Sequence, residues 1–120
     1  MASGVDAATE LLNSKAPLPD AIFCFNDAMA IGMINKFHAS GISIPGDVAM
    51  AGYDNLDASE HLSLTSVACP MRLMGQLAAR WAVELVNSDR KQTGHKVQVR
   101  LVVRQSSASG NSNGRSERLS

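Results

Sequence analysis

Residues Ala21–Asp54 read AIFCFNDAMAIGMINKFHASGISIPGDVAMAGYD and contain two short apolar runs separated by a segment with helical periodicity. The apolar runs, Ala21–Phe25 and Val48–Ala51, both end abruptly in polar residues. A continuous apolar run is typical of a parallel strand that is covered on both faces. The stretch therefore predicts a strand–helix–strand unit of an α/β fold, in which ligands bind beyond the carboxyl ends of the strands.

The segment between the two runs predicts a helix that begins at Asn26 or Asp27 and ends near Ser40. Gly41 is well placed as its left-handed C-cap. Its inward stripe is formed by Ala30, Met33, Ile34 and Phe37. Met29 and Ile31 lie off that stripe and give the helix a second apolar face. That face is either buried within the same domain or part of a subunit interface.

The rest of the chain continues the alternation of helices and strands. The expected elements are a helix over Val5–Ser14, a loop over 16–20, a strand over Leu64–Ala68, a helix from Met71 to Ser88 and a strand over Val97–Arg104. This order predicts a layered α/β fold with a parallel sheet and right-handed crossovers. The first helix has no strand before it, so we expect the chain to be the later part of a larger domain.

Composition excludes several classes of function. The 120 residues include 11 basic and 11 acidic side chains, and this zero net charge disfavours a nucleic-acid surface. Cys24 and Cys69 form no C-x-x-C pair and are expected to be reduced, with no metal site and no cofactor. No signal peptide or membrane span is visible, so a cytoplasmic location is expected.

The two predicted strands end in similar polar pairs, Asn26-Asp27 and Asp54-Asn55. One interpretation is that Asn26 and Asp54 form hydrogen bonds with the hydroxyl groups of a ligand such as a sugar, while Asp27 caps the helix. The alternative is that these residues only cap a helix and form a turn. Two adjacent strand ends with polar residues at the same level favour a ligand site.

Catalytic motifs are absent from the sequence. There is no G-x-S-x-G, no phosphate-binding glycine loop and no H-E-x-x-H. His38, His61 and His95 are widely separated and are interpreted as surface residues. We therefore expect a binding protein and not an enzyme.

A set of short motifs occurs in order between Asp20 and Ser107. They are Asn26-Asp27-x-Met29-Ala30-x-Gly32, Gly41-Ile42-x-x-Pro45-x-Asp47-Val48, Gly52-Tyr53-Asp54-Asn55, Leu64-Thr65-Ser66-Val67-x-x-Pro70 with Met74-Gly75, and Leu101-Val102-Val103-Arg104-Gln105-Ser106. The ordered set resembles the effector-binding domain of the LacI/GalR family of bacterial transcriptional repressors.

The resemblance implies a fold like that of periplasmic sugar-binding proteins, with two α/β subdomains around a cleft. Residues 1–107 would be a partial effector-binding domain. Residues 1–68 and 97–107 would supply most of its C-terminal subdomain, and the helix 70–88 would belong to the N-terminal subdomain. The polar composition from Ser106 onward predicts a disordered tail, assigned to residues 108–120.

The resemblance also implies roles for particular residues. In the family, the positions that match Asn26, Asp54 and Met71 contact or line the effector site, and the effector is a sugar or a related metabolite. The helix that begins at Asp27 and the loop after Asp54 form the homodimer interface in the family. The interface candidates are Ala28, Ile31 and Glu60.

The helix-turn-helix of the family is absent from this sequence, so any contact with DNA would be made by an N-terminal domain. Two alternatives remain open. A sugar-binding protein of the periplasmic transport type would share the fold, although the ending Leu101–Ser106 favours the repressor. A flavodoxin-like enzyme fragment would need a nucleophile, an acid–base pair or a phosphate loop, and none is visible.

Overall fold

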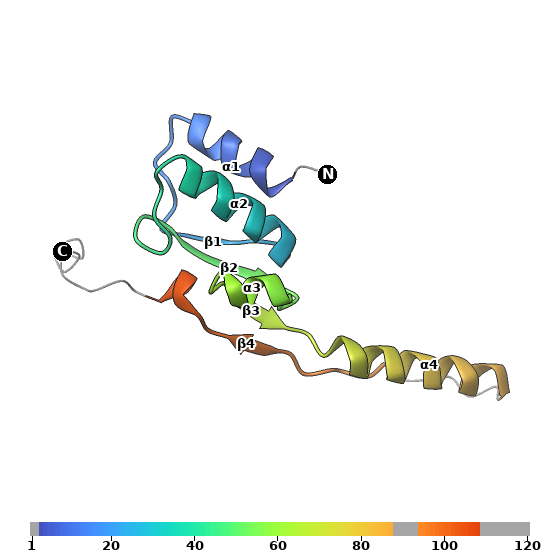
Figure 1. Cartoon of the computed structure of the whole chain (residues 1–120). Helices are drawn as coiled ribbons and strands as arrows, with labels where there is room; N and C mark the ends of the chain where they lie inside the picture. Colours follow the sequence, from blue (N-terminus) through green and yellow to red (C-terminus); the bar gives the residue numbers. More distant parts are fainter. Residues whose placement is uncertain (1–2, 88–93, 109–120) are drawn as a thin grey trace, which may run out of the picture.

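The computed structural model of the chain describes residues 3–87 and 94–108 and alternates helices with strands (Figure 1). The elements are α1 (Gly4–Asn13), β1 (Ala21–Phe23), α2 (Asp27–Ala39), β2 (Ala49–Tyr53), α3 (Asp57–His61), β3 (Thr65–Ala68), α4 (Met71–Asn87), β4 (Arg100–Val102) and the 3-10 helix η1 (Gln105–Ser107). Each predicted helix and strand has a counterpart, and the first and last strands are shorter than predicted.

The strands form one sheet in the order β1-β2-β3-β4, in which β1, β2 and β3 are parallel. β4 pairs antiparallel with β3, with Ser66 opposite Val102. A parallel crossover requires the connecting helix to pack back on the sheet. α4 instead projects away from the other elements, and the chain returns beside β3 in the opposite direction (Figure 1). The expected α/β fold is confirmed, and only this last strand departs from a parallel sheet.

The core lies between the sheet and α2. All four residues of the predicted inward stripe of α2 are buried, and they pack with Cys24, Val48 and Met50. Gly41 has the left-handed φ of 77° that its role after the helix requires.

α1 packs on the other side of α2. A Cβ at Gly4 would overlap the carbonyl oxygen of Met29, so the two helices approach closely where this glycine lies. Met29 and Ile31 are partly buried and pack against the core cluster. The second apolar face of α2 is therefore partly covered within the chain.

The opposite face of the sheet is open in the described part of the chain. Phe23 is 64% exposed and Phe25 is 74% exposed. Leu101 on β4 is 56% exposed. The prediction that Ala21–Phe25 is covered on both faces is therefore wrong for the described residues, because the chain supplies helices to one face only.

Residues beyond β4 belong partly to the fold. Ser106 is 4% exposed and lies in η1, where its hydroxyl joins β2 to β3. The prediction of disorder from Ser106 onward is wrong at Ser106 and Ser107, because composition does not reveal a hydroxyl that satisfies buried backbone groups. Residues 109–120 of the predicted tail and Ser88 at the end of the predicted helix lie outside the described residues. No helix in residues 3–87 or 94–108 has the length and apolar character to cross a membrane.

Candidate functional site

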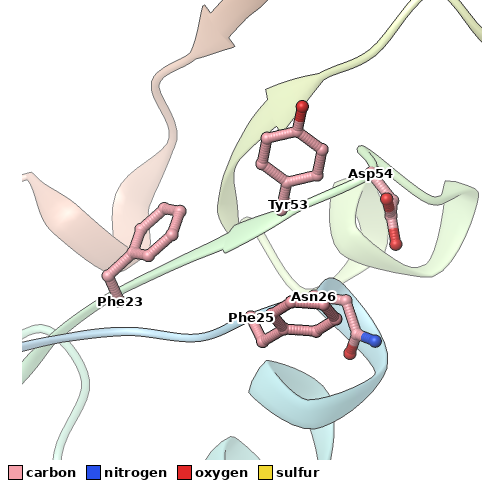
Figure 2. Close-up of a pocket in the computed structure, with 5 residues that line it drawn as sticks. All are labelled: Phe23, Phe25, Asn26, Tyr53 and Asp54. Carbon is pink, nitrogen blue, oxygen red and sulfur yellow. The ribbon is translucent and has the colours of Figure 1, made fainter.

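A pocket of about 350 Å³ lies at the carboxyl ends of β1 and β2. Figure 2 shows its lining, which consists of Phe23, Phe25, Asn26, Tyr53 and Asp54. The volume is in the range of small-molecule sites. The position is the one expected for ligands in a parallel sheet. The structure therefore brings together the two strand ends that the sequence singled out.

Asn26 is the N-cap of α2, because its Oδ1 accepts a hydrogen bond of 2.9 Å from the Met29 backbone N–H. Of the two caps that the sequence allowed, Asn26 or Asp27, the structure has Asn26, and the interpretation that assigned the cap to Asp27 is wrong. Asp27 is the first helical residue, and its side chain turns inward. Within residues 3–87 and 94–108 the amide nitrogen of Asn26 has no hydrogen-bond partner, so it can donate to a ligand.

Asp54 follows β2 in a left-handed conformation, with φ of 104°. Its backbone N–H donates to the Val67 carbonyl oxygen at 3.0 Å, which anchors this turn to β3. Asp54 lines the pocket, as does Asn26. A carboxylate and an amide donor at one site suit a ligand that carries hydroxyl groups.

Aromatic side chains form the rest of the pocket, and none of them was predicted from the sequence as a site residue. Phe23 lies at one end of the pocket and the two polar residues at the other (Figure 2). The signal was present, since Phe23 and Phe25 are two residues apart and share a face of an extended chain. A side-chain hydrogen bond with Cys69 raises the pKa of the Tyr53 phenol.

The residue after Asn26, Asp27, has a fully buried carboxylate. It accepts hydrogen bonds from the Leu56 backbone N–H at 2.9 Å, the Ser59 hydroxyl at 2.5 Å and the Ser66 hydroxyl at 2.7 Å. Burial, and then the negative charge of Asp27, raise the pKa of the Cys24 thiol to about 11. Cys24 is thus an unreactive core residue, as expected from the apolar run that contains it.

The remaining predicted site residues lie apart from this pocket. Met71 opens α4, is 62% exposed and does not line the pocket. Ala28 and Ile31 lie on α2, exposed and partly buried respectively, and Glu60 is exposed on α3.

The three histidines are exposed, as expected of surface residues. His95 packs edge-on against Trp81, with ring centroids 6.0 Å apart. In the described residues no three His, Cys, Asp or Glu side chains come together as metal ligands.

Comparison with known proteins matches residues 1–107 to the periplasmic binding protein-like domain. The HTH-type transcriptional repressor PurR of Photobacterium profundum is 36% identical over 107 residues, which are 87% of this chain and 32% of that protein. The chain thus spans about a third of the length of this curated relative.

Solved structures agree with the sequence match. A LacI family transcriptional regulator from Enterococcus faecium with bound ribose is 33% identical, with a TM-score of 0.74 over 88% of this chain and 39% of that one. The transcriptional regulator CelR in complex with cellobiose is 37% identical, with a TM-score of 0.77 over 86% of this chain and 32% of that one. These relatives are transcriptional regulators, and none is described as an enzyme.

Proposed function

This chain belongs to the LacI/GalR family of transcriptional regulators, and we propose that it forms part of the site at which such a regulator binds a small-molecule effector. The observation that carries the proposal is the pocket in which Asn26 and Asp54 meet aromatic side chains. Because two related structures contain ribose and cellobiose, we propose a sugar or sugar derivative as the effector. The aromatic faces would pack on the apolar face of a sugar ring.

Binding would act through the arrangement of two subdomains. We propose that residues 1–68 and 97–107 belong to one subdomain and that α4 belongs to the other. The support is α4, which has no buried residue and projects away from the sheet (Figure 1). An effector held between two such parts shifts their equilibrium only if it binds one arrangement more tightly. This division would be contradicted if the amide hydrogens along α4 exchanged as slowly and as uniformly as those along α2.

In an intact regulator this shift would change the affinity of a DNA-binding domain for its operator, since effector and DNA affinities are linked. The relatives' helix-turn-helix provides the precedent. Met71 is the first residue of α4 and does not line the pocket. We therefore propose that Met71 approaches the effector only when the second subdomain closes.

Titration calorimetry with D-ribose and with cellobiose tests the site. Asp54→Asn and Asn26→Asp should each weaken binding by about tenfold to a hundredfold, since each removes a charged acceptor or an amide donor. Asn26→Asp keeps an oxygen for the Met29 N–H, so the helix cap survives. Asp57→Asn on exposed α3 is the matched control and should leave the affinity unchanged. If the wild type binds neither D-ribose nor cellobiose, the proposed ligand class is refuted.

We also propose that α2 and α3 form a homodimer interface that contains Ala28, Ile31 and Glu60. The flanks of α3 support this, because Leu56 is 43% exposed and Leu62 is 40% exposed. Exposed apolar side chains beside an incompletely covered helix are typical of an interface core.

Sedimentation equilibrium tests the interface. Ala28→Arg places a charge at an exposed position of α2 and should raise the dimer dissociation constant by at least about tenfold. Asn13→Arg at the exposed end of α1 adds the same charge and should leave that constant unchanged. The proposal would be contradicted if the wild-type chain stayed monomeric over a 100-fold range of protein concentration that extends to its solubility limit.

A further inference from the structure

The buried carboxylate of Asp27 connects segments that are distant in sequence. It follows Asn26 directly and lies at the start of α2. Its hydrogen-bond donors lie 29 to 39 residues further along the chain, on the loop after β2, on α3 and on β3. An acid in the first turn of a helix ordinarily faces solvent and interacts with the helix dipole. Asp27 is instead completely shielded and serves as an acceptor for the three neighbouring segments.

Ser66 extends this network by one further hydrogen bond. Its hydroxyl donates to Asp27 and accepts from the Asn55 backbone N–H at 3.0 Å. Asp27 itself accepts from the Leu56 N–H. Two consecutive backbone N–H groups after Asp54 therefore depend on the same carboxylate, one through Ser66 and one directly.

The backbone held in this way is an unfavourable one. Asp54 has φ of 104° and Asn55 has φ of 54°, a region that residues other than glycine rarely adopt. Such conformations persist where the surrounding structure over-determines them. Arg104, the residue before η1, holds the same turn, because its Nη2 donates to Asn55 Oδ1 at 2.8 Å. The turn that presents Asp54 to the pocket is thus fixed from two sides.

We propose that Asp27 is a positioning residue of the effector site. It does not line the pocket. It joins the start of α2, which Asn26 caps, to the turn that carries Asp54, and so sets the separation of the two polar groups before a ligand arrives. A site held in its binding geometry loses less entropy on binding than one that must order itself. This inference rests on the proposed function for the identity of the pocket as an effector site.

A purely structural role for Asp27 makes a different prediction from a positioning role. If Asp27 only stabilised the domain, loss of either serine donor would have the same consequences. If Asp27 positions the turn, Ser66 matters to the site and Ser59 does not, because only Ser66 also binds the Asn55 N–H. Ser59 keeps its own backbone hydrogen bonds to Leu56 and Leu64 after its hydroxyl is removed.

Amide hydrogen exchange by NMR on the 120-residue chain tests this pattern without a ligand. Ser66→Ala should speed exchange at Asn55 by at least about tenfold and leave Leu56 protected. Ser59→Ala should leave both amides protected. Asp27→Asn should speed exchange at both, and the two serine variants keep the test decisive if this variant does not fold. Equal effects of Ser66→Ala and Ser59→Ala would overturn the proposal.

D-ribose titration of the same variants provides the second measurement. Ser66→Ala should lower the affinity by at least about tenfold, and Ser59→Ala should leave it unchanged. If Ser66→Ala speeds exchange at Asn55 but leaves the affinity for D-ribose unaltered, Asp27 has only a structural role and the proposal is overturned. If the wild type does not bind ribose, the proposed ligand fails, and the exchange pattern alone decides whether Asp27 holds the Asp54 turn.

Discussion

Gly52→Ala should lower the free energy of unfolding by about 3–5 kcal/mol, an effect large enough to unfold a marginally stable domain. Gly52 lies buried in β2, and a Cβ built on it would overlap Asp27 Oδ1 and come within 3.3 Å of Asp27 Cα. Asp27 cannot move aside without breaking its three hydrogen bonds, and a buried carboxylate that loses its donors is strongly destabilising.

Gly75→Ala is the matched control. Gly75 lies in α4, and a Cβ there meets no atom within 4 Å. The same substitution should therefore stabilise the helix by about 0.5–1 kcal/mol, since alanine has the higher helix propensity. Urea unfolding followed by circular dichroism measures both variants. A Gly52→Ala chain whose unfolding midpoint matched that of the wild type would show that the Asp27 carboxylate is not held against β2.

Gly52 also shows how far a sequence can predict this site. A glycine after an apolar run permits either a close approach of the backbone or a turn, and in the structure Gly52 makes a close approach to Asp27. Its partner could not be identified, because Asp27 lies 25 positions earlier and looked like a helix cap. Helix capping is a local rule, and Asn26 satisfies it equally well. The burial of Asp27 arises from contacts between residues far apart in the sequence, which no local rule describes.

The open face of the sheet illustrates the same limit. A continuous apolar run such as Ala21–Phe25 predicts a buried strand because nearly all such strands are covered. Whether a cover exists depends on other segments, and the described residues supply helices to one face only. The pocket lies along this open face, so the misjudged exposure of Phe23 and Phe25 explains why they were not identified as lining residues. That Asn26 and Asp54 come together was predicted correctly, because sheet geometry alone places the ends of neighbouring parallel strands side by side.

Ser106→Ala should lower the free energy of unfolding by about 2–4 kcal/mol, although the sequence places this serine at the start of a polar tail. Its hydroxyl accepts from the buried Thr65 backbone N–H at 2.8 Å and donates to the Met50 carbonyl oxygen at 2.6 Å. Removal of the hydroxyl leaves both backbone groups without that partner in the core, where water cannot replace it. The loss should also loosen β3, in which Ser66, the residue after Thr65, supports the Asn55 turn.

Ser107→Ala is the comparison that isolates this effect. The Ser107 hydroxyl lies 2.6 Å from Thr65 Oγ1, but that oxygen also bonds to the backbone of Arg104, accepting at 2.8 Å and donating at 3.0 Å. Thr65 therefore keeps partners, and the cost should stay below about 1 kcal/mol. Circular dichroism is the suitable probe, because the single tryptophan, Trp81, lies on α4 away from the core. Equal destabilisation by the two variants would mean that η1 stabilises the sheet through its backbone and not through the buried Ser106 hydroxyl.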